Sequence, residues 1–385
     1  MRILFDSCQT QYKTPFGTLR TGECCVLQIC IPTDVGTSGV RLMLEDSEHA
    51  VCAELPFSFA SRGEDGYELW RLEFTRQETG LHFYWFRIDK RDGGSFRLFR
   101  QGHDTNMEAG EKWQLSVIPA DFRVPDFAPG GVMYQIFPDR FARSGSCDLT
   151  WKLQPFWVHE SPDELPEYRP DAQGEVRNND FFGGNFAGIR EKLPYLQELG
   201  VGVLYLNPIF MAWSNHRYDT ADYRRPDPML GTEEDFRALC DEAHARGMRV
   251  ILDGVFSHTG SNSVYFDAKH VFGHGAVSDP NSPYRRWYRF RHYPDDYEAW
   301  WGIRTLPCVE ELDETYLHYI IEDEDSVIAH WLRLGADGFR LDVVDELPDE
   351  FVRRLRRRMR EIDPQSLLLG EVWEDASNKR AYGVS

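Results

Sequence analysis

The chain has 385 residues, of which 42% are hydrophobic and 14% aromatic, so it has enough apolar side chains for a sizeable core. Lys plus Arg number 43 and Asp plus Glu number 63, which gives a net charge of −20. Such a charge repels nucleic-acid phosphates and anionic membrane surfaces, and it suits a neutral substrate. The start MRILFDSCQT lacks the apolar centre of a signal peptide, and no apolar run is long enough for a membrane span. We therefore expect a cytoplasmic protein with no nucleic-acid or membrane partner.

The eight cysteines are scattered along the chain, with one adjacent pair at Cys24-Cys25. None has the spacing to other cysteines or histidines that is typical of a zinc site. In a chain without a secretion signal, they are expected to be reduced and mostly buried thiols. The cysteine pattern therefore predicts no metal ion.

Residues 1–120 have the pattern of an all-β domain. Several short segments alternate apolar and polar residues, and Gly, Asp or Pro separates them. The expected strands are CCVLQIC, VRLMLE, YELWRLEF, GLHFYWFRID, SFRLFR and WQLSVI. Strands of this length and spacing predict a β-sandwich similar to a carbohydrate-binding module. The stretch 121–131, rich in Pro and Gly, is expected to be the linker.

From residue 132 onward, strands alternate with helices. Helical periodicity marks residues 186–199, the segment around 236–243 and the segment DEFVRRLRRRMREID. The expected strands are VMYQIF, VGVLYLNPIF, RVILDGVF, GFRLDVV and LLLGEVW. This alternation predicts a parallel sheet with helical crossovers, and the apolar strands indicate burial on both faces.

Polar side chains follow each of these strands, as at the carboxyl rim of a (β/α)8 TIM barrel. An open doubly wound sheet would also bind ligands there, but no Gly-rich phosphate loop follows the first strand. We therefore predict an α/β fold for residues 132–385: a TIM barrel of which about five strands are present, preceded by the all-β sandwich. The long stretch at about 259–320 is expected to be an inserted subdomain.

Two acids end neighbouring strands, Asp342 after GFRL and Glu371 after LLLG. Adjacent parallel strands lie about 5 Å apart, which is also roughly the carboxyl separation in retaining glycosidases. Arg340 points to the same side as Asp342, because the two residues are two positions apart in a strand. We expect Arg340 to keep Asp342 ionised for attack and burial to raise the pKa of Glu371 as the acid. A purely structural Arg–Asp pair is an equal alternative for the pair alone.

Several motifs resemble the α-amylase family of glycoside hydrolases. DGVFSH (253–258), GFRLDVVDE (338–346) and GEVWEDAS (370–377) are similar to three consecutive conserved regions of that family. VMYQIFPDRF (132–141) and YLNPIFMAWSNHRYDTADY (205–223) resemble its early barrel segments. The preceding β domain is placed as in the neopullulanase, cyclomaltodextrinase and maltogenic amylase group.

This resemblance implies a retaining hydrolase that cleaves α-1,4 and possibly α-1,6 glucosidic bonds in maltodextrins, pullulan or cyclodextrins. It also implies an α-glucan oligosaccharide as the substrate, a covalent glucosyl–aspartate intermediate and a possible homodimer through the N-terminal domain. A transglycosylase or an oligo-1,6-glucosidase is the alternative among enzymes. A non-catalytic carbohydrate-binding protein is the alternative from another class.

The resemblance also implies the residue roles. Asp342 matches the nucleophile, Glu371 the general acid/base and Arg340 the partner of the nucleophile, whereas Asp253 matches a structural aspartate. The residues expected to bind substrate are His258, Tyr218, His216, Glu346 and Trp373. Each of these has a structural alternative, since a lone histidine or tyrosine often packs in a core. The segment WYRFRHYPDDYEAWWGI (287–303) could likewise line a sugar groove or form the core of the inserted subdomain.

The sequence departs from the family pattern in two respects. Five barrel strands are expected where the family fold needs eight, and no substitute for the family's third catalytic carboxylate is found in 372–385. We therefore expect a truncated chain with little or no hydrolase activity of its own. We also expect no cofactor. Calcium, which the resemblance allows, is an alternative that the residues do not favour. Ser257 replaces the family's usual Asn, and the residues around Asp148 and Asn185 offer few oxygen ligands.

Overall fold

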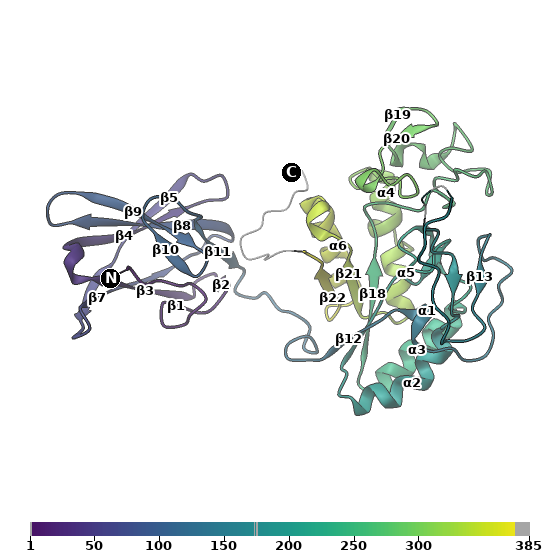
Figure 1. Ribbon diagram of the computed structural model, residues 1–385, viewed down its shortest axis with the longest axis horizontal. Coiled ribbons are helices and arrows are strands. Elements are labelled where there is room, and N and C mark those ends of the chain that lie inside the picture. Colours follow the sequence, from purple (N-terminus) through teal and green to yellow (C-terminus); the bar gives the residue numbers. More distant parts are fainter. Residues whose placement is uncertain (1, 173, 175, 374–385) are drawn as a thin grey trace. The chain divides into compact units, whose positions relative to one another are not determined.

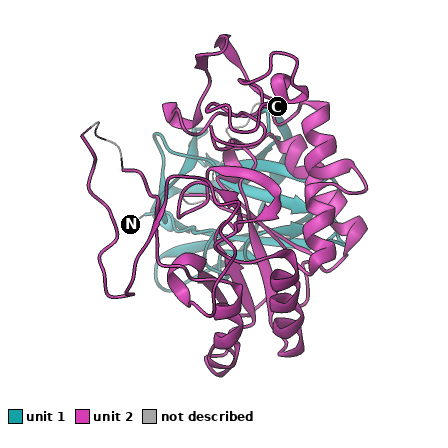
Figure 2. Ribbon diagram, turned by 90° about the vertical axis from the view of Figure 1, so that its right-hand side faces the viewer, with its two compact units in different colours: residues 1–123, 376–378 teal, residues 124–375, 379–385 magenta. Residues whose placement is uncertain are grey.

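A computed structural model of the chain describes residues 2–172, 174 and 176–373. The chain divides into two compact units, which we call the N-terminal unit (residues up to Arg123) and the C-terminal unit (from Val124 onward). Figure 2 shows the two units in different colours. Each unit has its own hydrophobic core, and each is described by itself.

The N-terminal unit consists of two antiparallel-rich sheets that share one core, as in a β-sandwich. One sheet has the order β1-β3-β7-β6, with β1 at Lys13–Thr14, β3 at Cys24–Pro32, β7 at Tyr67–Thr75 and β6 at Ser58–Arg62. The other has the order β10-β9-β8-β11-β2, with β4 and β5 joined through β8. Its strands are β2 Leu19–Arg20, β4 Thr37–Glu45, β5 Val51–Pro56, β8 Gly80–Lys90, β9 Ser95–Gln101, β10 Asp104–Asn106 and β11 Trp113–Ile118.

Alternating burial explains why six of these strands were predictable. In β3 and β11, for example, every second residue is buried in the core between the sheets. The strands β5 and β6 were missed because they have hardly any buried residues, so their sequences lack the alternation. β5 pairs with β4 in one sheet and β6 pairs with β7 in the other, so each of these exposed strands is specified by its neighbour rather than by its own pattern.

The C-terminal unit is built on a five-stranded parallel sheet in the order β12-β15-β18-β21-β22. The strands are β12 Met133–Ile136, β15 Val203–Leu206, β18 Arg249–Gly254, β21 Gly338–Leu341 and β22 Leu367–Gly370. The crossovers contain the helices α2 Phe186–Glu198, α3 Glu233–Ala245, α5 Val327–Leu334 and α6 Asp349–Ile362 (Figure 1). The five strands and the helices expected from periodicity are therefore confirmed.

Local sequence signals begin and end these helices. Thr232 and Asp235 form a reciprocal capping box at the start of α3. Ser326 caps the start of α5, and Gly335 follows its last turn with φ 120°. The apolar faces of α2, α3, α5 and α6 bury against the sheet, in one core with the strands. Burial on both faces of the central strands matches their continuous apolar sequences.

One glycine is required for the close approach of the last two strands. Gly338, the first residue of β21, has φ 154°, and a Cβ atom there would lie 2.0 Å from the carbonyl oxygen of Leu367. The absence of a side chain lets β22 pair with β21 in the register Leu341 opposite Gly370. This pairing places the residues after the two strands side by side.

The long segment between β18 and α5 contains short elements around a cluster of aromatic side chains. Its elements are η2 Pro283–Trp287, β19 Phe290–His292, β20 Asp296–Tyr297, η3 Trp300–Gly302, α4 Glu314–Leu317 and η4 His318–Glu322. In Figure 1 the arrow of β18 points toward the end of the unit that carries β19 and β20. The remaining elements are the short helix α1 Pro138–Phe141 and the two-stranded pairs β13 Trp157–Val158 with β14 Asp180–Phe181 and β16 Phe210–Ala212 with β17 Thr220–Pro226. No helix among the described residues has both the length and the apolar character needed to cross a bilayer.

Candidate active site

The carboxyl ends of β18, β21 and β22 bring three acids together. Asp253 lies in β18 in register with Arg340 of β21, and Asp342 and Glu371 follow directly after β21 and β22. The ladder continues through both acids, since Asp342 N donates to Gly254 O at 3.1 Å and Glu371 N donates to Leu341 O at 3.0 Å. Strand register therefore fixes the backbone positions of Asp253, Asp342 and Glu371.

The guanidinium of Arg340 binds all three carboxylates. Its Nη1 lies 2.7 Å from Asp253 Oδ1 and 2.9 Å from Asp342 Oδ1, and its Nη2 lies 2.5 Å from Glu371 Oε1. Arg340 is only 7% exposed, so these ion pairs lie largely out of water, where charges interact strongly. Because one planar group reaches Asp342 and Glu371 at once, the two acids face a common space. Arg340 thus forms ion pairs with three acids rather than with Asp342 alone.

The protonation of Asp342 differs from the sequence expectation. Burial and the neighbouring Asp253 carboxylate, with a smaller effect of Glu371, raise the pKa of Asp342 to about 7, although Arg340 acts in the opposite direction. The expectation that Arg340 keeps this carboxyl ionised is met in direction only, since Arg340 lowers the pKa but burial and Asp253 outweigh it. The physical reason is that burial disfavours the charged form and that the one cation is shared among three acids.

Asp253 is the most buried of the three acids, with 1% exposure. Besides Arg340, it accepts hydrogen bonds from the hydroxyls of Tyr205 (2.5 Å) and Tyr218 (2.9 Å). Tyr205 was missed by sequence reasoning. The available signal was its position in β15, since Tyr205 and Asn207 alternate as Arg340 and Asp342 do in β21. Asn207 Nδ2 donates to the Tyr218 hydroxyl at 3.1 Å, which completes the orientation of that ring.

His258 follows β18 and is 1% exposed. Ser257 Oγ lies 3.0 Å from its Nδ1, and its ring centroid lies 5.4 Å from that of Trp300. Burial lowers the pKa of His258 to about 4, and the backbone of Tyr218 offsets only part of that effect. The imidazole is therefore neutral at neutral pH, a form that both donates and accepts hydrogen bonds.

His216 and Tyr218 lie on a turn that buried charged side chains stabilise. Tyr218 N donates to His216 Nδ1 at 3.1 Å, and the intervening Arg217 has φ 64°, an unfavourable conformation for a non-glycine residue. Arg217 donates to Asn215 O and to Asp227 Oδ1, and the Lys152 ammonium lies 2.8 Å from Asp227 Oδ2. This group of three charges, Lys152, Asp227 and Arg217, is almost fully buried and stabilises the turn.

Glu346 has both carboxylate oxygens engaged. Trp300 Nε1 donates to Glu346 Oε2 at 2.8 Å, and Trp301 Nε1 donates to Oε1 at 3.0 Å. Trp301 is 68% exposed, and its ring centroid lies 5.6 Å from that of Trp373, which is 57% exposed. Glu346 therefore holds Trp301, one ring of an exposed aromatic pair that sequence reasoning did not anticipate. Within the Trp-rich segment Trp287 is buried in the core, as one of the two alternatives expected, whereas Trp301 faces solvent and a sugar groove there stays a prediction.

The residue after Asp342 is strained. Val343 has φ 40° and ψ 59°, and a β-branched side chain strongly disfavours this left-handed conformation. Val343 N donates to Glu371 Oε2 at 3.2 Å, and Val344 N donates to Glu371 O at 3.1 Å. Strain of this kind costs about 1–3 kcal/mol and persists where surrounding contacts enforce it, which is common at active sites. The strained turn thus orients the Glu371 carboxylate toward Asp342.

Comparison with known proteins places this geometry in a family. Residues 135–384 match the pattern described as "Alpha amylase, catalytic domain". The chain belongs to the alpha-amylase family. The resemblance inferred from the sequence motifs is therefore confirmed, and the relatives of the chain are glycoside hydrolases.

Two relatives and one solved structure show the extent of the similarity. The amylopullulanase of Thermoanaerobacterium saccharolyticum is 33% identical over 97% of this chain and 32% of its own length. The intracellular maltogenic amylase of Bacillus subtilis (strain 168) is 36% identical over 66% of this chain and 40% of its own length. The type III pullulan hydrolase from Thermococcus kodakarensis superposes with a TM-score of 0.58 and 28% identity, over 96% of this chain and 61% of that chain. The chain thus spans about a third to two thirds of the length of these proteins.

Alpha-amylase catalytic domains are (β/α)8 barrels that need no organic cofactor, and relatives of this chain carry an N-terminal β domain. The described parallel sheet, with its helical crossovers and its acids at the carboxyl ends, agrees with that architecture.

The residues considered for calcium do not fit that ion. Asn185 Oδ1 already accepts from Gly188 N (2.8 Å) and Ser144 N (3.2 Å), and its Nδ2 donates to Ser144 O (2.7 Å). Asp148 Oδ1 accepts from both the backbone N and the hydroxyl of Thr150. Calcium needs six to eight oxygen ligands, whereas the oxygens of Asn185 and Asp148 are already engaged in hydrogen bonds within the chain. The Ser257 hydroxyl is hydrogen-bonded to His258 Nδ1.

Proposed function

We propose that the chain contributes the nucleophile and the general acid/base of a retaining α-glucan hydrolase, Asp342 and Glu371. The observation that supports this proposal is the single Arg340 guanidinium that binds both carboxylates at the ends of adjacent strands. Retaining glycosidases need two such groups about 5 Å apart, whereas inverting enzymes leave additional room for a water molecule between them.

The chemistry follows from these two roles. The Asp342 carboxylate attacks the anomeric carbon while Glu371 gives its proton to the glycosidic oxygen, so a glucosyl–aspartate ester forms and the leaving sugar departs as an alcohol. Glu371 then removes a proton from water, the resulting hydroxide attacks the same carbon, and the ester bond to Asp342 breaks. Both side chains return to their initial protonation states.

Sharing Arg340 couples the protonation of the two acids. When Glu371 holds a proton, its ion pair with Arg340 is lost and the guanidinium charge is left to Asp253 and Asp342. The negative charge of Glu371, which raises the pKa of Asp342, is removed at the same time. Protonation of the acid therefore favours ionisation of the nucleophile.

For the substrate, we propose α-1,4 glucosidic bonds in maltodextrins, pullulan or cyclodextrins, with α-1,6 bonds as the alternative linkage. The relatives described above are named for amylopullulanase, maltogenic amylase and pullulan-hydrolase activities, and the net charge of −20 suits a neutral polysaccharide. Tyr218, His216 and His258 would contact the sugar that reacts with Asp342, because Tyr218 is joined to the same acid cluster through Asp253. A tyrosine ring provides an apolar face for a sugar and a hydroxyl for orientation.

A second candidate is a transglycosylase, and an oligo-1,6-glucosidase is the alternative among hydrolases. The exposed Trp301–Trp373 pair favours glycosyl transfer, since the Trp301 ring, held by Glu346, and the adjacent Trp373 ring offer a stacking surface for an acceptor sugar. Product analysis on maltotriose, pullulan and cyclodextrin distinguishes longer products from hydrolysis products. A non-catalytic sugar-binding protein would bind these sugars and form neither.

Completeness of the barrel is part of this proposal. We propose that residues 132–385 contribute five of eight barrel strands, with residues 259–320 as an inserted subdomain and residues 1–120 and 121–131 as the sandwich and linker. The chain alone would turn over glucan slowly or not at all. The expectation that 372–385 lacks a third catalytic carboxylate concerns mainly residues 374–385, which lie outside the described residues.

The proposal also covers assembly and location. A homodimer through the N-terminal unit is supported by the exposed edge strand β6, in which Phe59 is 52% exposed. Light scattering of the wild type and of Phe59→Ser tests this contact, and a monomeric wild type contradicts it. A cytoplasmic location is supported by the intracellular maltogenic amylase relative.

The decisive experiment traps the intermediate. We would incubate the chain, and any longer natural form of it, with a fluorinated glucosyl donor that forms the ester quickly and hydrolyses slowly, and then identify the labelled peptide by mass spectrometry. The proposal expects the label on Asp342 and loss of labelling in Asp342→Asn. Label on another residue, or normal turnover by Asp342→Asn in a form whose wild type is active, would refute the assignment.

A further inference from the structure

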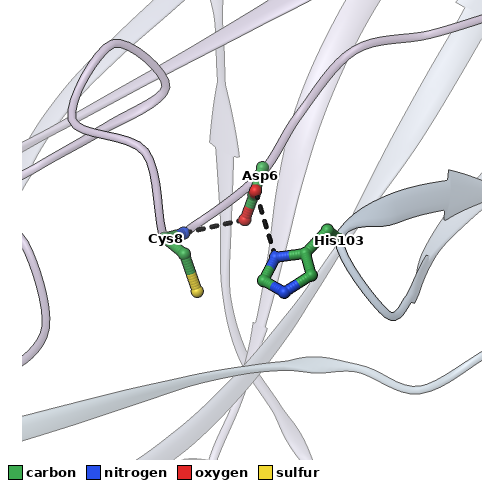
Figure 3. Close-up of side chains that lie close together, drawn as sticks. All are labelled: Asp6, Cys8 and His103. Carbon is green, nitrogen blue, oxygen red and sulfur yellow. Dashed lines mark hydrogen bonds and ion pairs between the residues drawn. The ribbon is translucent and has the colours of Figure 1, made fainter.

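A cluster of three potential metal ligands lies in the N-terminal unit, far in sequence from the acids described above. Asp6, Cys8 and His103 each offer one ligand atom, and these atoms all lie within 4.8 Å of one another. Figure 3 shows the three side chains around a common space, with His103 coming from the turn between β9 and β10. From their spacing in the sequence these residues were not predicted to form a site, since 95 positions separate Cys8 from His103.

We propose that Asp6, Cys8 and His103 bind a zinc ion. A thiolate, an imidazole nitrogen and a carboxylate oxygen form a ligand set that suits Zn²⁺ and disfavours the hard ions calcium and magnesium. A water molecule would fill the fourth tetrahedral position, because Cys8 and His103 are exposed to solvent.

The distances between the donor atoms support this geometry. Asp6 Oδ2 lies 3.3 Å from His103 Nδ1, which is long for a charge-assisted hydrogen bond. Two ligands that are each about 2.0–2.1 Å from a tetrahedral zinc ion lie about 3.3–3.4 Å apart. The oxygen and the nitrogen therefore already have the separation of a ligand pair. The thiol of Cys8 lies within 4.8 Å of both atoms, and a side-chain rotation at this exposed residue can bring it to the separation of a zinc ligand.

The surroundings orient the carboxylate as a ligand requires. Asp6 is 8% exposed, and its Oδ1 accepts the backbone N–H of Cys8 at 2.9 Å. Gln9 Nε2 donates to Oδ2 at 3.1 Å. Oδ1 is therefore fixed by an outer contact of the kind that metal-binding acids usually have, while Oδ2 faces His103.

Cys8 also lines a cavity of about 180 Å³, together with Lys13, Phe16 and Arg100 among others. The cavity gives water access to the thiol. The Lys13 ammonium donates to the carbonyl oxygens of Pro15 (2.8 Å) and Gly17 (2.7 Å), so its charge is already engaged.

A second group of potential ligands in the described chain, Glu314, His318 and Glu322, does not support the same inference. Arg354 already supplies a cation there, with Nη1 at 3.0 Å from Glu322 and 3.6 Å from Glu314. By contrast, the contacts described for the Asp6 carboxylate come from the backbone amide of Cys8, the side-chain amide of Gln9 and the imidazole of His103.

The test uses the whole chain, stripped with a chelator and dialysed against Zn²⁺ alone. We expect one bound zinc per chain, a higher melting temperature of the N-terminal unit with zinc, and a thiolate-to-metal charge-transfer band when Co²⁺ replaces Zn²⁺. Cys8→Ser should abolish the band, and His103→Asn should lower zinc affinity at least tenfold. The matched control is Cys24→Ser, which removes an equally exposed thiol on β3.

Several outcomes would overturn the proposal. These are no zinc bound by the wild type, zinc bound equally by Cys8→Ser and His103→Asn, or a charge-transfer band that is lost in Cys24→Ser. Circular dichroism of each variant shows whether it folds. If Cys8→Ser does not fold, His103→Asn decides the outcome, because His103 is an exposed turn residue whose side chain is 79% accessible.

Discussion

Replacing Asp342 by Asn should stabilise the fold at high pH, although it removes the proposed nucleophile. Burial and Asp253 raise the pKa of Asp342 from 3.8 to about 7, so the folded state binds this proton more tightly than the unfolded state. The stabilising contribution of the protonated group is complete below about pH 4 and is lost as the pH rises through about 7. A change of about three pKa units corresponds to about 4 kcal/mol. The side-chain amide introduced by Asp342→Asn cannot ionise, so this substitution avoids the loss.

The measurement is equilibrium unfolding of the wild type and Asp342→Asn at about pH 4 and pH 8, followed by hydrogen exchange in peptides of the C-terminal unit. We expect a free energy of unfolding higher by up to about 4 kcal/mol for Asp342→Asn at pH 8, and a difference near zero at pH 4. Asp163→Asn, an exposed carboxylate in the same unit, is the matched control and should change stability by less than about 0.5 kcal/mol. If Asp342→Asn destabilises the protein at pH 8, or if the difference is the same at both pH values, the account of the shared Arg340 is wrong.

Three further predictions concern other parts of the C-terminal unit. Lys152→Met leaves Asp227 buried without its ammonium partner and should destabilise the protein by about 3–5 kcal/mol. The control Lys192→Met removes an exposed lysine and should have little effect. Unfolding by denaturant measures both variants, and equal effects would contradict the role of the pair. Burial lowers the pKa of His258 to about 4, so its contribution to stability is complete above its unfolded value of 6.5 and falls as the pH drops toward 4. Between pH 7 and pH 4 the free energy of unfolding should therefore fall by about 3 kcal/mol less in His258→Gln than in the wild type. An imidazole NMR signal of His258 that titrates near pH 6.5 in the wild type would contradict this prediction. Because the Asn185 amide is fully engaged, neither added Ca²⁺ nor a calcium chelator should shift the melting temperature, and a shift of several degrees would show a site elsewhere.

Most of the C-terminal unit could be predicted because its strands and helices are buried on predictable faces. GFRL and LLLG lie next to each other, as the order of strands and crossovers indicated. The strands β5 and β6, which pair with β4 and β7 respectively, could not be predicted in this way, since neither contains a buried residue. Tyr205 was also overlooked, although it alternates toward the same side as Asn207.

The residues of the candidate site could be predicted from the sequence, but the pKa of Asp342 could not. The motifs named Arg340, Asp342 and Glu371, and the structure joins them through one guanidinium. The sequence suggested that Arg340 would keep Asp342 ionised, because those two residues are close in the chain. Burial of Asp342 and the Asp253 carboxylate, which lies 87 positions from Arg340 and shares its charge, together raise the pKa of Asp342 against the effect of Arg340.

The sequence by itself determined the strand and helix pattern, the order of the parallel strands and the acids that end them, because each depends on the burial and spacing of neighbouring residues. Only the tertiary structure decided how one arginine is shared by three acids, how Asn185 uses its hydrogen-bonding groups and how Cys8 meets His103. Those outcomes depend on distances between side chains from distant segments. The energies of charges and hydrogen bonds change steeply with such distances, and a linear sequence does not contain them.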